Sequence, residues 1–240
     1  MAEKQVKAET VEAADVVERA KGFWFKYSRF IIIGGSAVIV ILGAYLGYKY
    51  FIKLPNEKTA GEMIFPAEKL FGKMAGESSY NKDTVNIVLN GDKASGVTGL
   101  LKIAGSYGGT QSGNRAEYMI GACYLQLKQF DKAIKHLKEF DGNGASQVQS
   151  KAYLLLGHAY SEQKKTDDAL DYYKKAGSVS DLDEGMVAEA LFIAGRYADA
   201  TGKTKEAIEL FQKLKDTYPL SLKVSSGDVE KYLAALGVTK

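Results

Sequence analysis

Cysteine and histidine are scarce in this chain, and each shortage excludes a kind of site. Cys123 is the single cysteine, so an internal disulfide is excluded; an oxidising compartment remains permitted. Its place beside Tyr124 on an apolar helix favours a buried thiol over a nucleophile. His136 and His158 are the only histidines and lack the spacing of metal ligands, so we expect no metal and no cofactor. No Ser-His-Asp set or paired carboxylate stands out from ordinary helix surface charge, so we expect no enzyme.

The chain also lacks an excess of charge of one sign. After residue 52 the chain has 25 Lys and Arg against 24 Asp and Glu, and no basic stripe, so we expect no nucleic-acid partner. The glycine-rich stretch GGTQSGN, residues 108–114, lacks the Gly-Lys-Ser/Thr ending of a phosphate loop and follows a predicted helix. It is therefore interpreted as a turn, with Asn114 as the cap of the next helix.

A long uncharged run is present near the N-terminus. Nineteen residues from Phe30 to Tyr48 carry no charge, and Tyr50, Phe51 and Ile52 extend the run to residues 30–52. Such a helix is long enough to cross a hydrocarbon layer of about 30 Å. A cleavable signal peptide would need a shorter run and a small-residue cleavage site, which KYFIKLPNE does not offer. We expect a single uncleaved transmembrane helix embedded in the lipid bilayer.

The orientation of this span rests on a margin of one positive charge. Four basic residues precede the span and three follow it: Arg19, Lys21, Lys26 and Arg29, against Lys49, Lys53 and Lys58. The positive-inside rule then places residues 1–29 in the cytoplasm as a tail and exports the C-terminal part, with a cytosolic domain as the topological alternative. Gly43 and Gly47 form a G-x-x-x-G pair that would admit a partner helix, or they are ordinary glycines of a membrane helix.

A pattern of small and aromatic residues recurs after the span. An apolar residue precedes a Gly, an Ala follows the Gly by twelve positions, and a Leu or aromatic residue comes four later. The copies comprise Ile120, Gly121, Tyr124, Ala133 and Leu137; Leu156, Gly157, Tyr160, Ala169 and Tyr173; and Ala194, Gly195, Ala207 and Phe211, closed by Pro219. Chance would give about 0.3 such occurrences. The third copy has Ala198 in place of the Tyr.

These residues resemble the tetratricopeptide repeat, in which each unit is a pair of antiparallel helices. We expect each Gly of a first helix to lie against the small Ala of the second, and the aromatic residues to fill the gap to the next pair. The glycines recur 36 and 38 residues apart, which predicts long connections in FDGNGASQ and AGSVSDLDEG. The predicted class is all-α: a single transmembrane helix followed by a tetratricopeptide-repeat α-solenoid.

The remaining segments are assigned as connectors and caps. Pro66 is expected to open a helix, TVNIVLNGD to form a helix that ends at Asn90-Gly91, and TGLLKIAGSYG to form another. DVEKYLAALG has Val229, Tyr232, Leu233 and Leu236 on one face, which indicates a capping helix. The predicted divisions are a connector at 53–65, a helical lead or N-terminal cap at 66–112, three repeats at 113–222 and a C-terminal capping helix at 223–240.

By analogy with tetratricopeptide proteins, the first helix of each pair lines a concave binding groove. The expected groove residues are Tyr118, Ala122, Leu125 and Gln126; Leu154, His158, Ser161 and Glu162; and Phe192, Arg196, Asp199 and Ala200, with Arg115, Lys151 and Glu189 as weaker candidates. This wall would suit an extended or helical apolar segment better than an anionic tail. The alternative, that its aromatic residues are core or lie under a cap, stays open.

A cytoplasmic tail, one span and then these repeats resemble the YfgM-type ancillary subunit of the bacterial Sec translocon. The lead YNKDTVNIVLNGD and the entry LLKIAGSYGGTQSGNRAEYMIGACYL carry the resemblance. It implies an inner-membrane protein with a periplasmic repeat domain that acts beside SecYEG, with a PpiD-type membrane-anchored chaperone or prolyl isomerase and emerging secretory polypeptides as partners. An envelope scaffold for another membrane or division complex is the alternative function.

Overall fold

A computed structural model describes residues 2–76, 81–179 and 183–238, with side chains described from residue 17 onward and not for residues 75 and 76. The chain divides into two compact units, Met1–Pro55 and Asn56–Lys240. The connection AGSVSDLDEG, predicted from the wider repeat spacing, lies partly outside the described residues.

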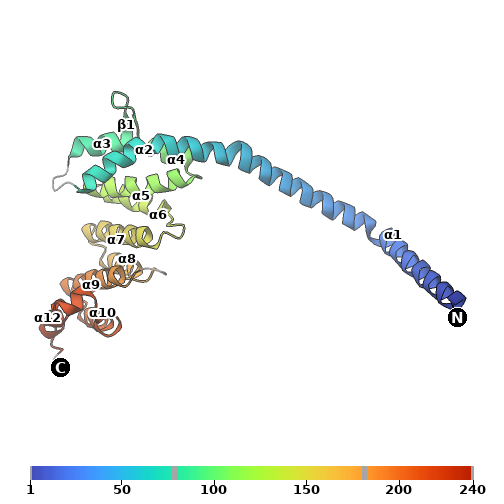
Figure 1. The fold of residues 1–240 in the computed structure, drawn as a ribbon. Helices are drawn as coiled ribbons and strands as arrows, with labels where there is room; N and C mark the ends of the chain where they lie inside the picture. Colours follow the sequence, from blue (N-terminus) through green and yellow to red (C-terminus); the bar gives the residue numbers. More distant parts are fainter. Residues whose placement is uncertain (1, 77–80, 180–182, 239–240) are drawn as a thin grey trace. The chain divides into compact units, whose positions relative to one another are not determined.

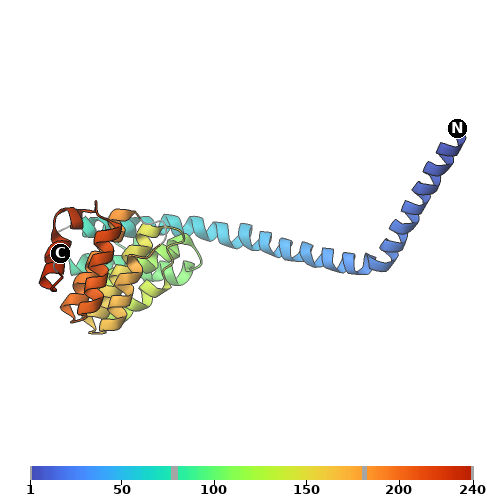
Figure 2. The ribbon, with the colours of Figure 1, turned by 90° about the horizontal axis from the view of Figure 1, so that it is seen from below.

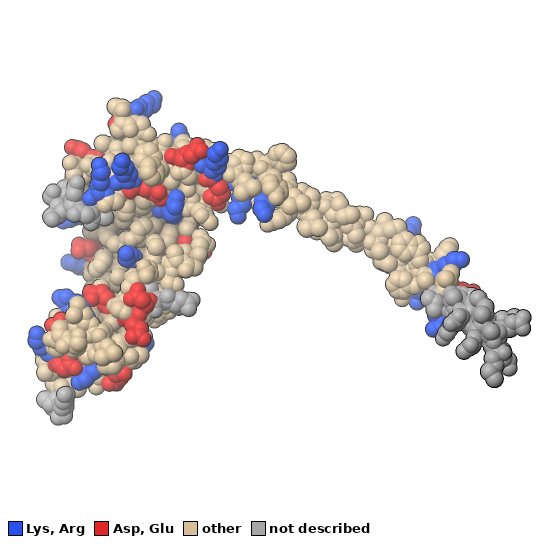
Figure 3. Space-filling view, in the orientation of Figure 1, with Lys and Arg blue, Asp and Glu red and all other residues tan. Residues whose placement is uncertain are grey.

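The first unit is helical throughout its described part. Helix α1 (Ala2–Tyr48) is followed by the short π-helix η1 (Lys49–Lys53) and by the start of α2 (Leu54–Gly76). The candidate span has a mean hydropathy of 2.3 over its most apolar window, and none of that window is buried. Figure 3 shows an uncharged stretch of surface between the charged residues that flank it. This helix is therefore long and apolar enough to cross a membrane, as the sequence predicts.

The second unit contains three antiparallel helix pairs stacked in sequence order (Figures 1 and 2). The pairs are α5 (Gln111–Gln126) with α6 (Phe130–Glu139), α7 (Ser146–Glu162) with α8 (Thr166–Ala176), and α9 (Glu184–Ala200) with α10 (Thr204–Thr217). The first helices also contact one another in succession, α5 with α7 and α7 with α9. The all-α class is confirmed.

The repeat glycines are required for a different contact from the one expected. A Cβ at Gly121 would lie 2.4 Å from Cγ of Leu137, and one at Gly157 would lie 2.5 Å from Cδ1 of Tyr173. A Cβ at Gly195 would lie 2.7 Å from Cε1 of Phe211, the residue equivalent to Leu137 and Tyr173. The closest neighbour is thus the large residue sixteen positions on. The expected Gly–Ala contact is present in the first repeat, where a Cβ at Gly121 would lie 3.3 Å from the carbonyl oxygen of Ala133. At Gly157 and Gly195 the nearest atoms all belong to Tyr173 and Phe211, and Ala169 and Ala207 are fully buried nearby in the core.

Each repeat turns between its helices through the same hydrogen-bonded loop. In the second repeat the N–H of Lys165 donates to the carbonyl of Tyr160 at 3.0 Å, and the N–H of Lys164 donates to that of Ser161 at 2.9 Å. This is the Schellman pattern, which needs one residue with a left-handed backbone. That residue is Lys164, with φ of 59°; the equivalent residues are Lys128 at 58° and Gly202 at 77°.

Helix α2 corrects two expectations. It begins at Leu54, so Pro66 lies inside it and does not open a helix, and the segment predicted as a connector is helical. Three residues on one face, Ala60, Ile64 and Ala67, are fully buried in the core of the second unit. The expected connector is therefore part of the folded repeat unit from residue 60.

Between α2 and the repeats lie α3 (Lys82–Asn90), α4 (Leu100–Tyr107) and a small hairpin that the sequence did not reveal. Helix α3 ends before Gly91 with φ of 84°, which confirms the predicted stop. The hairpin pairs β1 (Gly91–Asp92) with β2 (Val97–Thr98) antiparallel, Gly91 opposite Thr98. A Cβ at Gly91 would lie 2.6 Å from the N of Gly99, so the turn requires glycine there.

The C-terminal end of the stack is covered by α11 (Leu222–Ser225) and α12 (Asp228–Ala235). Helix α12 begins after Gly227, which has φ of 77°. Val229 and Leu233 on its inner face are 0% and 5% exposed, and the ring of Tyr232 packs 5.1 Å from that of Phe211. The predicted capping helix is thus confirmed.

Candidate protein-interaction surface

Helix α5 is capped at its first turn by two side chains, neither of which is Asn114. The hydroxyl of Thr110 accepts from the N–H of Gly113 at 3.0 Å. The carboxylate of Glu57, on α2, accepts from the N–H of Gln111 at 3.1 Å. A negative charge at a helix N-terminus is favourable because the exposed N–H groups point toward it. The sequence-based choice of Asn114 as the cap is therefore wrong, and α2 is attached to the first repeat at this point.

A pocket of about 420 Å³ opens beside this attachment, on the first-helix side of the stack. It lies between α2, the N-terminal half of α5, the loop after α6 and the start of α7. Its lining is mainly apolar and comprises Phe71, Tyr118, Met119, Phe140 and Val148, with Glu68, Gln111, Asn114, Arg115, Asp141, Gly142, Asn143 and Ala145 at the margins. An apolar floor with polar margins is typical of sites that receive a large side chain of a partner.

The wall formed by residues 140–145 is held by hydrogen bonds to helices on either side. Asn114 donates from Nδ2 to the carbonyl of Asp141 at 2.6 Å and accepts from its N–H at 2.9 Å. The N–H of Gly142 donates to Oε1 of Gln149 at 2.7 Å. Because both sides of the loop are fixed, the pocket is present before any partner binds, which lowers the entropic cost of binding.

Tyr118, the first of the expected groove residues, is half-buried in this pocket. Its ring lies 5.4 Å from that of Phe140, tilted by 53°. Burial raises the pKa of Tyr118, so the hydroxyl stays protonated at neutral pH. Within the described residues this hydroxyl makes no hydrogen bond, and it can therefore donate to a carbonyl of a bound chain. Arg115 lies at the margin and pairs with Glu68, Nε to Oε1 at 3.1 Å.

Four more of the expected groove residues meet in a second pocket of about 370 Å³. They are Leu125, Gln126, His158 and Glu162, which line it together with Lys128 and Phe130. The hydroxyl of Tyr173 lies 2.9 Å from Nδ1 of His158. The His158 residue is exposed, yet desolvation by the packed groups around its ring lowers the pKa of His158 and favours the neutral imidazole. The neutral ring can accept the hydrogen bond from Tyr173.

The remaining expected residues are not gathered in either pocket. Leu154 is half-buried against the core of the second and third repeats. Phe192 is 6% exposed, because Tyr232 of the capping helix and Phe211 cover it at centroid distances of 5.6 and 5.9 Å. A partner in the groove cannot reach its ring, which corrects the expectation that Phe192 faces outward.

Two expected residues of α9 and two of α1 remain at the surface. Arg196 is exposed, with its guanidinium 6.0 Å from the centroid of the Phe192 ring, and Asp199 is half-buried. Gly43 and Gly47 lie on the exposed surface of α1, and a Cβ at either would meet nothing within 4 Å. Both glycines are therefore accessible to a second helix.

The sequence interpretation missed the residues that line the pockets from neighbouring segments. Phe71 belongs to α2, Phe140 and Asp141 to the loop after α6, and Phe130 to the start of α6. A signal for α2 was present: Ala60, Ile64, Ala67 and Phe71 recur at helical spacing. Phe130 and Phe140 carry no comparable signal, because their exposure depends on how adjacent repeats pack.

The titratable groups of the described region do not form a reactive centre. No group of three or more His, Cys, Asp or Glu side chains comes together there in a way that could hold a metal ion. Cys123 is fully buried, and burial raises the pKa of its thiol to about 12. A thiol in this state is not a nucleophile at neutral pH.

Comparison with known proteins agrees with this geometry. A comparison with curated proteins found no match. The family model described as Tetratricopeptide repeat-like domain matches residues 21–221, well over half of the chain. Repeat domains of this kind generally act as interaction modules without enzymatic activity. The match includes the candidate span as well as all three helix pairs, and the chain therefore belongs to the tetratricopeptide repeat-like domain family.

Proposed function

We propose that this protein is a membrane-anchored interaction module of the Sec translocon, with its repeats in the periplasm. In this role it links SecYEG to a PpiD-type chaperone and to emerging secretory polypeptides. The preformed apolar pocket at Tyr118 is the observation that carries the proposal. It suits an apolar side chain of a partially folded chain or of a partner helix. The resemblance in tail, span, lead segment and repeats supports the translocon as the location.

The short chain between span and repeats supports the proposed role near a membrane channel. Seven residues separate Ile52, the last apolar residue of the span, from Ala60, the first buried residue of the repeat unit. Even a fully extended chain of that length covers less than about 30 Å. Such a tether raises the effective concentration of the pocket toward any partner or client at the same membrane. Weak contacts then suffice for function.

Site-specific crosslinking in living cells tests the proposal. A photoreactive amino acid at Tyr118 is expected to crosslink to translocon subunits, to the membrane-anchored chaperone or to secretory chains, identified by mass spectrometry. The matched control places the same residue at Glu209, an exposed position of α10 outside both pockets. Crosslinks that appear equally at Glu209 would be nonspecific. Purified full-length chain with Tyr118→Ala should bind an unfolded apolar client about tenfold more weakly.

Other crosslinking outcomes would favour a different function. One stoichiometric crosslink to a division or envelope-assembly protein, with no translocon subunit, chaperone or secretory chain, would favour the scaffold and refute the proposal. Protease treatment of spheroplasts tests the topology, because a periplasmic repeat domain is degraded while a cytosolic one is protected.

A further inference from the structure

A third surface lies beside the Tyr118 pocket, with which its adjoining hollow shares Phe140 and Asp141, and is formed by residues of α6 and α8 around the end of α7. The rings of Tyr160 and Tyr172 stack there with centroids 5.4 Å apart and planes 9° from parallel. Lys138 and Lys165 place their ammonium groups 5.4 and 5.7 Å from the Tyr160 centroid. Lys175 lies 4.6 Å from the centroid of Tyr172. Three cations are thus gathered around one pair of rings, each held by a cation–π contact.

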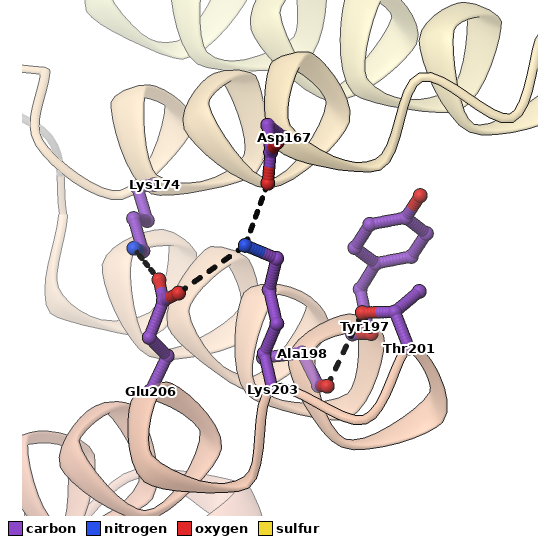
Figure 4. A network of polar contacts seen from close by, with 7 residues as sticks. All are labelled: Asp167, Lys174, Tyr197, Ala198, Thr201, Lys203 and Glu206. Carbon is purple, nitrogen blue, oxygen red and sulfur yellow. Dashed lines mark hydrogen bonds and ion pairs between the residues drawn. The ribbon is translucent and has the colours of Figure 1, made fainter.

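The equivalent lysines one repeat later are neutralised by ion pairs (Figure 4). Lys174 stands 36 residues after Lys138, and Lys203 stands 38 after Lys165, which are the two repeat spacings. Lys174 pairs with Glu206. Lys203 lies 2.6 Å from Oδ1 of Asp167 and 3.4 Å from Oε1 of Glu206. At this junction each lysine therefore has a carboxylate partner within the chain.

Three differences leave the first junction without those partners. Ala198, which Figure 4 shows beside the ion pairs, replaces the ring of Tyr160. Asp168 takes the position of Glu206 and is one methylene shorter. Asp131 takes the position of Asp167, but it accepts a hydrogen bond at 2.7 Å from Nε2 of Gln163 and reaches no lysine. Asp168 acts on Lys138 electrostatically but forms no ion pair with it, so the described residues of this junction keep the cations without a paired carboxylate.

Lys138, Lys165 and Lys175 consequently have no acidic side chain within ion-pair distance among the residues that the structure describes, and all three are exposed. The pKa of Lys138 is raised, chiefly by its contact with the Tyr160 hydroxyl, so it is charged under physiological conditions. We propose that this lysine–tyrosine cluster docks an acidic polypeptide segment, whose carboxylates take the places that Glu206 and Asp167 occupy at the next junction.

The surroundings favour a polypeptide with an apolar residue beside its acids. A pocket of about 260 Å³ adjoins the cluster and is lined by Lys138, Phe140, Tyr153 and Tyr172, together with Leu137, Asp141, Gln149 and Leu156. It can receive one aromatic or aliphatic side chain. Single-stranded nucleic acid binds by stacking bases on open rings, but Tyr160 is only 7% exposed and is covered by Tyr172 and two lysines. The ring of Tyr160 is thus not available to bases.

Fluorescence anisotropy with the full-length chain in detergent micelles tests this inference. The probe is a labelled peptide of about twelve residues that contains four glutamates and one phenylalanine; its control has glutamine at the four positions. The acidic peptide is expected to bind, and binding should weaken as salt rises. Lys138→Gln with Lys165→Gln should weaken it about tenfold, the effect of losing two exposed ion pairs.

A matched variant separates the site from net charge. Lys205→Gln with Lys213→Gln removes the same charge from exposed positions of α10 and should change the affinity less than about twofold. Equal weakening by both pairs, equal binding of the glutamine peptide, or displacement by inorganic phosphate or an oligonucleotide at similar concentration would overturn the inference. This assay measures binding of a defined peptide in vitro, whereas the proposed function is tested by crosslinks from Tyr118 in cells, so failure here is distinct from failure of the proposed function.

Discussion

At the residue scale, the repeat glycines act by making room for a large side chain of the partner helix. Gly157 is the clearest case, because a Cβ would lie 2.5 Å from both Cδ1 and Cε1 of Tyr173. Tyr173 cannot retreat easily: its hydroxyl bonds to His158 at 2.9 Å, and Tyr197 packs on its ring at 5.0 Å. The glycine is therefore fixed by the positions of three aromatic rings rather than by helix geometry.

Gly157→Ala is expected to destabilise the chain despite the higher helix propensity of alanine. Overpacking of a core contact costs about 1–3 kcal/mol, which exceeds the gain of up to about 1 kcal/mol from propensity. Urea unfolding of the detergent-solubilised chain measures the difference. Gly72→Ala on exposed α2, where a Cβ would meet nothing within 4 Å, should stabilise by up to about 1 kcal/mol. Stabilisation by both substitutions would contradict this account of the repeat glycine.

The sequence identified the groove helix face correctly but not what lies over it. Tyr118, Leu154 and Phe192 occupy the same register, three residues before each repeat glycine. Tyr118 lines a pocket, whereas the capping helix buries Phe192 to 6% exposure. Periodicity fixes the direction of a side chain relative to its own helix. Periodicity carries no information on which element packs against that helix face. Exposure differs at equivalent positions because the covering elements differ.

At the element scale, the helix pairs and the two helices before them, α3 and α4, were predictable from the sequence, while the start of α2 and the hairpin were not. Pro66 suggested a helix start, yet prolines are tolerated inside a helix when packing provides enough stabilisation. Here Ala60, Ile64 and Ala67 bury one face of α2 completely. The hairpin at 91–98 escaped detection because two-residue strands have no measurable alternation.

The turns within the repeats give a test at this scale. Lys164 adopts φ of 59°, a conformation that costs a residue with a Cβ about 1–2 kcal/mol, whereas glycine adopts it freely. Part of that gain is offset because glycine has more freedom in the unfolded chain. Lys164→Gly should therefore stabilise the chain by roughly 0.5–1 kcal/mol in urea unfolding.

The third repeat supplies the reverse substitution. Gly202 has φ of 77°, and a Cβ there would meet nothing within 4 Å, so Gly202→Lys tests backbone strain alone. It should destabilise by about the amount that Lys164→Gly gains. Lys213→Gly is the control for Lys164→Gly, because it replaces a lysine by glycine in the exposed middle of helix α10. It should destabilise the chain by roughly 0.5–1 kcal/mol. If Lys164→Gly destabilises as much as Lys213→Gly, the turn is not strained.

At the scale of the whole molecule, the all-α class and the single candidate span were both predictable, because each rests on a strong periodic or compositional signal. The span depends on the absence of charge from residues 30–48, and the array on a pattern repeated three times. The surfaces proposed to bind partners were less predictable. They lie at junctions between repeats, where Lys138 and Lys165 differ from Lys174 and Lys203 only in the neighbours that packing supplies.

The span itself provides the test at this scale. Each arginine at the centre of a membrane helix costs about 2.5–3.5 kcal/mol of insertion free energy. Ile39 and Leu42 lie near the middle of the uncharged run, and both are more than half exposed on α1. Ile39→Arg with Leu42→Arg should therefore release most of the chain from membranes washed with alkaline carbonate. Ile39→Leu with Leu42→Ile should leave it in the membrane fraction. Wild-type chain that is itself extracted by carbonate would show that residues 30–52 do not anchor the protein, and the tether argument for weak, local binding would then lose its basis.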